Sequence, residues 1–176
     1  GWLVKTGGVV DAYDIALKLL ANKSEYRFNV ISAPGLLSQY HSDTVKRLAA
    51  IASDRKDCIA VIDLAGFDQK TVSAVVGFAS EYDTSYAATY WPWLQTMNGG
   101  KTVWIPASTM IPGVYAFTDV SFEPWFAPAG MLRGGLNMII QPSKKLTSGN
   151  KNQLYSNNIN PIGVFPSNGV VVFGQK

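Results

Sequence analysis

One combination of residues could carry nucleophilic chemistry of the serine hydrolase type: His41, the only histidine, with Asp63 and Ser108. In such a site a serine hydroxyl attacks a carbonyl carbon, an imidazole takes the hydroxyl proton, and a carboxylate orients the imidazole. Asp63 follows a short apolar run, residues 59–62, and α/β folds place functional groups at the carboxyl ends of strands. Ser108 lacks the Gly-x-Ser-x-Gly turn of α/β-hydrolase nucleophiles. The hydrolase therefore stays an alternative to a simpler interpretation, in which Asp63 caps a loop and His41 lies near a helix start.

Metal and nucleotide sites have less support in the sequence. His41 and Asp43 offer two ligands where a metal site needs three or four, although a Mg²⁺ or Ca²⁺ site built from carboxylates alone stays open. Residues 99–102, Gly-Gly-Lys-Thr, end like a phosphate-binding loop, but Gln95 stands where that motif requires glycine. The two glycines are therefore predicted to form the turn of a hairpin. We expect neither a cofactor nor a metal.

The composition excludes several classes of protein. A chain of 176 residues can bury a core of ordinary size, and its single cysteine cannot form an internal disulfide. Charged residues make up 15% of the chain and aromatic residues 12%, which excludes a disordered protein because disordered chains are rich in charge and poor in aromatics. No apolar run approaches the roughly 18 residues of a membrane span. The net charge of +3 is too small to indicate a nucleic-acid partner.

The excess of aromatic residues is concentrated in one segment. Residues 84–132 hold ten of the 21 aromatic side chains and three charged ones: Lys101, Asp119 and Glu123. A groove that stacks nucleic-acid bases interleaves aromatic residues with Lys and Arg, and here Lys101 is the only cation. We therefore expect this segment to lie mainly in a stiff interior or against another protein, with no direct nucleic-acid contact.

The elements that must position these residues alternate along the first half of the chain. Apolar residues recur at helical spacing over residues 9–22, from Ser42 or Asp43 to Ala52, and from Asp68 or Thr71 to Ala79. Strands are predicted at 26–31, ended by Ala33-Pro34-Gly35, and at 59–62 and 85–91. Because parallel strands need crossover connections, this order predicts an α/β fold: a mixed, mainly parallel sheet flanked by helices.

The second half is predicted to be different. Five prolines break up residues 84–132, so we expect short elements and an aromatic-rich loop and hairpin segment there. Residues 143–158 are polar and basic, and residues 159–173 are strand-like in composition. We expect a terminal strand at 169–173 to be an open edge whose partner lies elsewhere, and the chain to be an excised piece of a longer protein.

Several motifs follow one another in the second half. They are Tyr90-Trp91-Pro92-Trp93, Trp104-Ile105-Pro106-Ala107-Ser108, Gly113-Val114-Tyr115-Ala116 with Asp119, Pro124-Trp125-Phe126-Ala127-Pro128-Ala129-Gly130, Arg133-Gly134, and Gly169 to Gly174. This series resembles the core of the contractile tail sheath proteins of bacteriophages and related injection machines. The resemblance is specific from about residue 84 to 174 and looser over residues 1–83.

The resemblance implies a structural function and no enzymatic one. It implies a subtilisin-like topology without peptidase activity, with residues 1–176 forming a single sheath core domain that lacks the N-terminal and C-terminal extensions by which neighbouring subunits interlock through shared strands. Such a subunit polymerises helically around the inner tail tube and contracts to drive the tube through the host envelope. The implied partners are neighbouring subunits, the tube protein, and the baseplate and tail terminator proteins. The implied location is the virion tail, assembled in the host cytoplasm without membrane insertion.

Residues that would serve this function fall into two groups. Three lysines of the basic segment are candidates for contacts to the tube or to adjacent subunits, the alternative being a solvated loop: Lys144, Lys145 and Lys151. Five aromatic residues are expected to stiffen the core, the alternative being an interface: Trp91, Trp93, Trp104, Trp125 and Phe126. Besides the hydrolase, a monomeric ligand-binding module stays open as a third class.

Overall fold

The alternating half of the chain forms a parallel sheet with helices against it. The computed structural model describes residues 8–123 and 125–176. The elements of this half are α1 (Gly8–Leu20), β1 (Val30–Leu37), α2 (Ser38–Arg55), β2 (Ile59–Asp63), α3 (Val72–Ala79) and β3 (Ala87–Trp91). The three strands pair in parallel, with Ile31 opposite Ala60 and Val61 opposite Ala88. The predicted fold class is confirmed, and the first strand begins at Val30 rather than at residue 26.

Two later strands extend this sheet. Strand β7 (Asn160–Phe165) pairs in parallel with β3, and β8 (Gly169–Val172) pairs antiparallel with β7, so the order is β1-β2-β3-β7-β8. The helix α6 (Ser148–Ser156) precedes β7 and packs against it. Thr147 caps this helix by a reciprocal pair of hydrogen bonds with Asn150, which explains why a helix forms in a segment whose composition indicated only a polar stretch.

The aromatic-rich segment supplies a second, smaller sheet. Its strands are β4 (Leu94–Asn98), β5 (Lys101–Ile105) and β6 (Ile139–Pro142), which pair antiparallel in the order β5-β4-β6. Gly99 and Gly100 both have positive φ angles, of 56° and 79°, as the two central residues of a tight hairpin turn require. The predicted hairpin is therefore confirmed. The remaining elements are short helices: η1 (Ala107–Thr109), α4 (Ile111–Ser121) and α5 (Gly130–Arg133).

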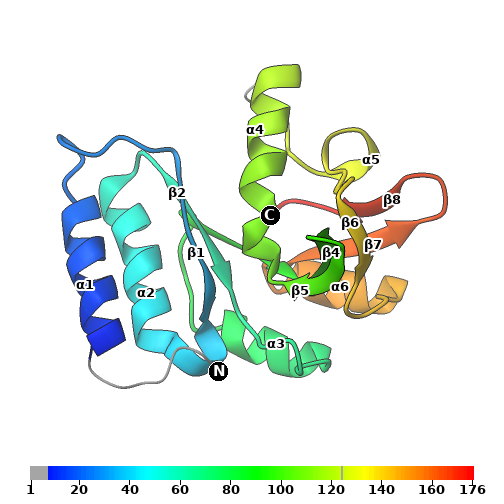
Figure 1. Cartoon of the computed structure of the whole chain (residues 1–176), viewed down its shortest axis with the longest axis horizontal. Helices are drawn as coiled ribbons and strands as arrows, with labels where there is room; N and C mark the ends of the chain where they lie inside the picture. The colour runs from blue at the N-terminus through cyan, green and yellow to red at the C-terminus, as the bar shows by residue number, and fades with distance from the viewer. Residues whose placement is uncertain (1–7, 124) are drawn as a thin grey trace.

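The core lies on both faces of the parallel sheet. Along β2, Ala60 and Ile62 belong to a cluster with α1, α2 and α3, whereas Val61 points to the opposite cluster with β4, η1 and α4. This alternation follows from the period of two residues in a strand. Figure 1 shows the resulting layers: α1 and α2 lie side by side on one flank of β1 and β2, and α4 and α5 lie on the other side of these strands.

Two predicted features of β1 and α2 are corrected. Residues 33–35, Ala-Pro-Gly, lie inside β1 instead of ending it. Proline is tolerated there because β1 is an edge strand and its pairing with β2 is interrupted between Ser32 and Leu37. Helix α2 begins at Ser38, four residues before the predicted start, but it is kinked at His41, whose φ of −134° and ψ of 41° are not helical.

The prediction of an open edge at residues 169–173 is wrong. The outer side of β8 accepts a short extended stretch: Leu136 N–H donates to the carbonyl of Val170, and Val172 N–H donates to the carbonyl of Gly134, at 2.9 and 2.8 Å. Beyond β8, Phe173 N–H donates to the carbonyl of Pro161. The chain therefore covers this edge itself, as folded proteins commonly do with exposed strands.

Among the helices that the structure describes, none is both long and apolar enough to cross a membrane.

Candidate functional site

Two members of the suspected triad meet in the core. Asp63 ends β2, and η1 packs across the ends of β1, β2 and β3, which brings Ser108 to the carboxylate. The Ser108 hydroxyl donates to Asp63 Oδ2 at 2.5 Å, and the Ser108 N–H donates to Oδ1 at 3.1 Å. Burial raises the pKa of Asp63 to about 6, against the lowering effect of the two hydrogen bonds from Ser108.

The third member is engaged differently. His41 Nδ1 accepts a hydrogen bond from Leu37 N–H at 3.4 Å, whereas a triad needs this nitrogen to donate to the carboxylate. The hydroxyl proton of Ser108 is directed at Asp63, so the serine is a donor to the carboxylate and not to an imidazole. The arrangement does not support a nucleophile. It supports the simpler interpretation, in which Asp63 ties the end of β2 to the loop of η1 and His41 lies at the kink in α2.

A polar cavity lies between the sheet and the end of the chain. It measures about 440 Å³ and is lined by residues of β2 and β3, the end of α3, and Asn158, Gln175 and Lys176. Thr89 Oγ1 and Gln175 Oε1 are buried without a hydrogen-bond partner in the described part of the chain. Such a hollow ordinarily holds water, because water satisfies buried polar atoms. In residues 8–123 and 125–176 no three His, Cys, Asp or Glu side chains gather as metal ligands.

Two of the three candidate contact lysines are held inside the subunit. Lys144 is half-buried, donates its ammonium to the carbonyl of Lys70, and lies 5.9 Å from the ring of Trp91. Lys151 lies 4.7 Å from the ring of Phe173 and 5.1 Å from that of Phe165. Lys145 is exposed. Lys145 is therefore the best placed of the three for a contact outside the subunit.

The five aromatic residues divide between core and surface. Trp91 is 2% exposed, the indole N–H of Trp93 donates to the carbonyl of Ala65 at 2.8 Å, and the half-buried Trp104 packs on Phe67 with ring centres 5.0 Å apart. Trp125 lies instead on the surface, with 77% of its area exposed. The predicted core position is wrong for Trp125, because residues 125–129 form neither a helix nor a strand that would pack its side chain inward.

Phe126, also expected in the core, is 40% exposed, and other large apolar side chains of α4, of α5 and of the residues between them are exposed as well. We call this surface the α4–α5 face and define it by Phe117, Val120, Phe122, Trp125, Phe126 and Leu132. The rings of Phe117 and Phe122 meet edge to face with centres 6.0 Å apart, and those of Trp125 and Phe126 lie 6.4 Å apart. The charge-poor composition of residues 84–132 was the signal for this face, although it could not separate surface from interior.

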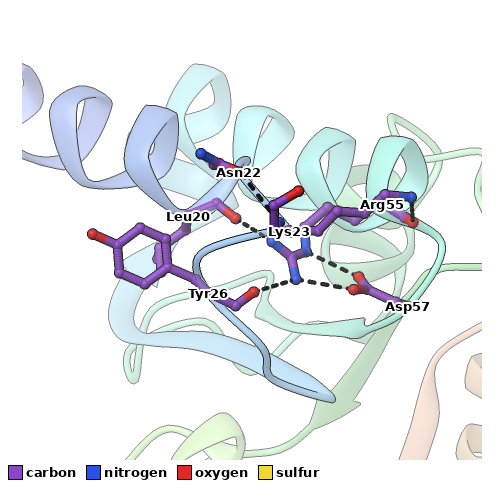
Figure 2. A network of polar contacts seen from close by, with 7 residues as sticks. Leu20, Asn22, Lys23, Tyr26, Arg55 and Asp57 are labelled. Atoms are coloured by element: carbon purple, nitrogen blue, oxygen red, sulfur yellow. Dashed lines mark hydrogen bonds and ion pairs between the residues drawn. The ribbon is translucent and has the colours of Figure 1, made fainter.

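At the opposite end, a buried arginine organises the helices α1 and α2. The guanidinium of Arg55 donates to the carbonyls of Leu20 and Tyr26 at 2.6 and 2.7 Å and forms a two-bond ion pair with Asp57 (Figure 2). It also lies 4.2 Å from the ring of Phe28. Because Arg55 is 3% exposed, this pairing fixes the end of α1 and the following loop against α2. No sequence motif predicted it.

Comparison with known proteins places this fold. The family described as phage tail sheath protein central domain matches residues 9–176. The tail sheath proteins of Vibrio phage KVP40 and Enterobacteria phage T4 are 34% and 32% identical over 73 residues, 42% of this chain and 11% of each relative. That of Salmonella phage ViI is 26% identical over 99% of this chain and 29% of its own length. The chain therefore spans 11% to 29% of these curated relatives.

Solved structures of contractile machines share the fold. A chain of the anti-feeding prophage baseplate matches 90% of this chain with a TM-score of 0.68 and 26% identity, over 40% of its own length. The contracted helical sheath of the same prophage matches 99% with a TM-score of 0.66 and 23% identity, over 45% of its length. The contracted sheath complex PVC, of an extracellular contractile injection system, matches 90% with a TM-score of 0.68 and 25% identity, over 42% of its length. The chain belongs to the phage tail sheath protein family, and residues 9–176 are its central domain.

Proposed function

We propose that the chain is the structural core of a contractile tail sheath subunit, which polymerises helically around an inner tube and contracts to drive the tube through the host envelope. The observation that carries the proposal is the match of residues 9–176 to the sheath central domain. The likeness to sheath and baseplate structures supports it, and so does the Ser108 hydroxyl, which donates to Asp63 and not to an imidazole.

Contraction without a nucleotide requires the energy to lie in the assembly. A set of identical contacts can store that energy when each contact differs slightly in free energy between the extended and the contracted state. The subunit core then moves as a body, and its cross-links suit that task. Trp93 bonds to Ala65, Asp63 to Ser108, and the hydroxyl groups of Tyr90 and Tyr115 lie 2.6 Å apart.

The partners follow from this role. The subunit contacts neighbouring sheath subunits, the tube protein, and the baseplate and tail terminator proteins, and it resides in the virion tail after assembly in the host cytoplasm. Strands that interlock neighbours are supplied by parts of the subunit outside these 176 residues. Lys145 is the lysine of the basic segment that reaches a tube or subunit partner, because its side chain is exposed.

Negative-stain electron microscopy of the complete gene product that contains these residues tests the proposal. We expect tubes or stacked rings. A monodisperse monomer at every concentration contradicts it. A serine-directed fluorophosphonate probe tests the alternative function, and we expect no labelling of Ser108, because this residue is 1% exposed and bonded to Asp63.

A further inference from the structure

The α4–α5 face is one connected surface and not a set of scattered side chains. The guanidinium of Arg133 lies 5.8 Å from the ring of Phe122 and 4.8 Å from that of Phe126, and its Nε donates to the carbonyl of Ala127. Arg133 therefore joins the Phe117–Phe122 pair to the Trp125–Phe126 pair. A tryptophan with most of its area in water is costly, and connected apolar surfaces of this kind mark sites of protein contact.

On the other side of β1 and β2, the helices α1 and α2 form a hollow about as large as one aromatic side chain. A mostly apolar cavity of about 230 Å³ lies between α1 and α2, over Leu17, Ala21, Ala50 and Ile51. It is smaller than the roughly 300–1,000 Å³ of pockets that hold drug-sized ligands, but larger than the ~150 Å³ that accommodates a benzene ring. We call it the α1–α2 groove. Its size fits one large aromatic side chain.

The charges around the two surfaces are complementary. The α4–α5 face carries the carboxylates of Asp119 and Glu123 beside one guanidinium, that of Arg133. Lys18 and Asp54 line the groove. Lys23 lines an adjoining hollow at the C-terminal end of α1, where its ammonium donates to the carbonyl of Arg55. The groove's other charged pair, Asp14 and Arg47, is already joined in an ion pair. None of the three side chains Asp119, Glu123 and Lys18 forms an ion pair within the described residues.

The two surfaces cannot meet within one subunit. Figure 1 shows α1 and α2 on one side of β1 and β2, and α4 and α5 on the other side. A contact between them therefore joins two copies through different surfaces, and such a contact repeats into a ring or an open helix. Helical repetition is what the proposed function requires, so this inference rests on that function.

We propose that the α4–α5 face docks on the α1–α2 groove of a neighbouring copy, with Trp125 inserted between the two helices. Asp119 and Glu123 then face Lys18 and Lys23, and Arg133 faces Asp54. Arg55 is a positioning residue for this contact, because it holds α1 against α2 and so keeps the groove open. Charge pairs at the rim set the register, while the buried indole supplies most of the affinity.

Crosslinking between two variants of the chain tests the contact. In a Cys58→Ala background, one copy carries Val120→Cys, which leaves Trp125 in place, and a second copy, enlarged by a size tag, carries Ala50→Cys. Both positions are exposed. A short bismaleimide then joins thiols that meet. A specific contact raises their effective concentration, so we expect about tenfold more mixed dimer than with Ser167→Cys, in the β7–β8 turn, as control. Phe126→Cys is a second probe of the same face.

Charge exchange separates a specific contact from general apolar adhesion. Lys18→Glu with Lys23→Glu in the groove copy lowers the yield of mixed dimer, and so does Asp119→Lys with Glu123→Lys in the face copy. Combining the two exchanged copies restores it. Equal crosslinking to Ser167→Cys, or no restoration, overturns the contact between copies. Protection of Val120→Cys by an added tube protein assigns the face to that partner instead.

The same cysteine pair in tubes of the complete gene product distinguishes this inference from the proposed function. Tubes that form and crosslink at these positions support both. Tubes that form without the crosslink overturn the docking contact and leave the sheath function standing. If the natural gene product forms no tubes, the sheath function fails, and the crosslinking of the isolated copies still decides the contact.

Discussion

Asp63 is the residue whose environment departs furthest from that of a surface carboxylate. Its folded pKa is about 6, whereas an aspartate in an unfolded chain titrates near 3.9. The folded state therefore binds a proton more tightly than the unfolded state between about pH 4 and pH 6, so the free energy of unfolding falls as the pH rises through this window. The loss is complete about one pH unit above the folded pKa, where Asp63 is ionised in both states.

Asp63→Asn should remove this pH dependence. The amide keeps both contacts, since its oxygen accepts from Ser108 N–H and its NH₂ donates to the Ser108 hydroxyl. Between pH 4 and pH 6 the free energy of unfolding of the natural chain should fall by roughly 2–3 kcal/mol relative to the variant, as measured by urea denaturation. Asp119→Asn, at an exposed carboxylate, is the control. Parallel profiles for the natural chain and Asp63→Asn would contradict the assignment.

Lys151 and Lys145 form a matched pair that separates an internal role from an external one. Lys151→Met keeps the apolar stem and removes the charge above the stacked rings of Phe165 and Phe173, so the free energy of unfolding should fall by about 1 kcal/mol. Lys145→Met should change it by less than about 0.5 kcal/mol, because Lys145 is exposed. Chemical denaturation of both variants measures this, and equal effects would count against it.

A proposed external contact of Lys145 has a different readout. Lys145→Glu should leave the folded chain intact but should reduce the number or the length of tubes formed by the complete gene product, seen by electron microscopy. Normal tubes that contract normally would remove Lys145 from the contacts.

At the scale of elements, the sequence predicted what depends on local pattern. The alternation of helix and strand before residue 91 and the Gly99-Gly100 hairpin are read correctly because spacing and turn chemistry are local properties. What failed depends on distant partners. The continuation of β1 through Pro34 requires knowing that β1 is an edge, and the covering of β8 requires knowing that Gly134 to Leu136 lies beside it. The subtilisin-like topology that the resemblance implies stays a prediction.

The candidate site also combines features that local sequence predicts with features that depend on distant packing. The sequence brought Asp63 and Ser108 to notice, but only the packing of η1 across the strand ends shows that their contact is a structural tie. Trp125 was misplaced because an aromatic residue in an irregular, proline-rich stretch carries no periodicity that says which way it points. The α1–α2 groove had no signal at all, since it depends on how two helices pack that are separated in the chain by the loop at 21–29 and by β1.

The cover over β8 gives a prediction at this scale. A Cβ atom at Gly134 would lie 2.9 Å from the Ala129 Cα, from the Gly130 nitrogen and from the Val172 carbonyl oxygen, all backbone atoms. Gly134→Ala should therefore force the stretch away from β8 and lower the free energy of unfolding by about 1–3 kcal/mol. Gly77→Ala, at an open position in α3, should instead raise it by up to about 1 kcal/mol. Thermal unfolding compares the stability of the two variants. No loss of stability in Gly134→Ala would mean that the stretch at 134–136 can shift without losing its pairing with β8.

At the scale of the whole molecule, two different surfaces lie on opposite sides of β1 and β2. The α4–α5 face presents exposed aromatic rings, and the α1–α2 groove lies between two helices that Arg55 holds together. Between them lies a sheet with a core on each face, cross-linked by Trp93, Asp63 and Tyr90. A body of this kind can transmit a rotation from one end to the other without changing its internal contacts, which suits a subunit that moves when its neighbours move.

One contact of this size should not hold two subunits together alone. Docking of the α4–α5 face involves a few side chains and buries less than the ~1,200 Å² of a stable interface. The isolated chain should therefore sediment as a 19.1 kDa monomer at micromolar concentration. Analytical ultracentrifugation measures this, and polymers of the isolated chain would show that the contact is far stronger than its area allows. Trp125→Ala should leave the monomer's free energy of unfolding within about 0.5 kcal/mol of the natural value, because the side chain is exposed. The same substitution in the complete gene product should weaken every repeat of the helix at once, so the loss of one indole contact per pair of chains adds up along a tube.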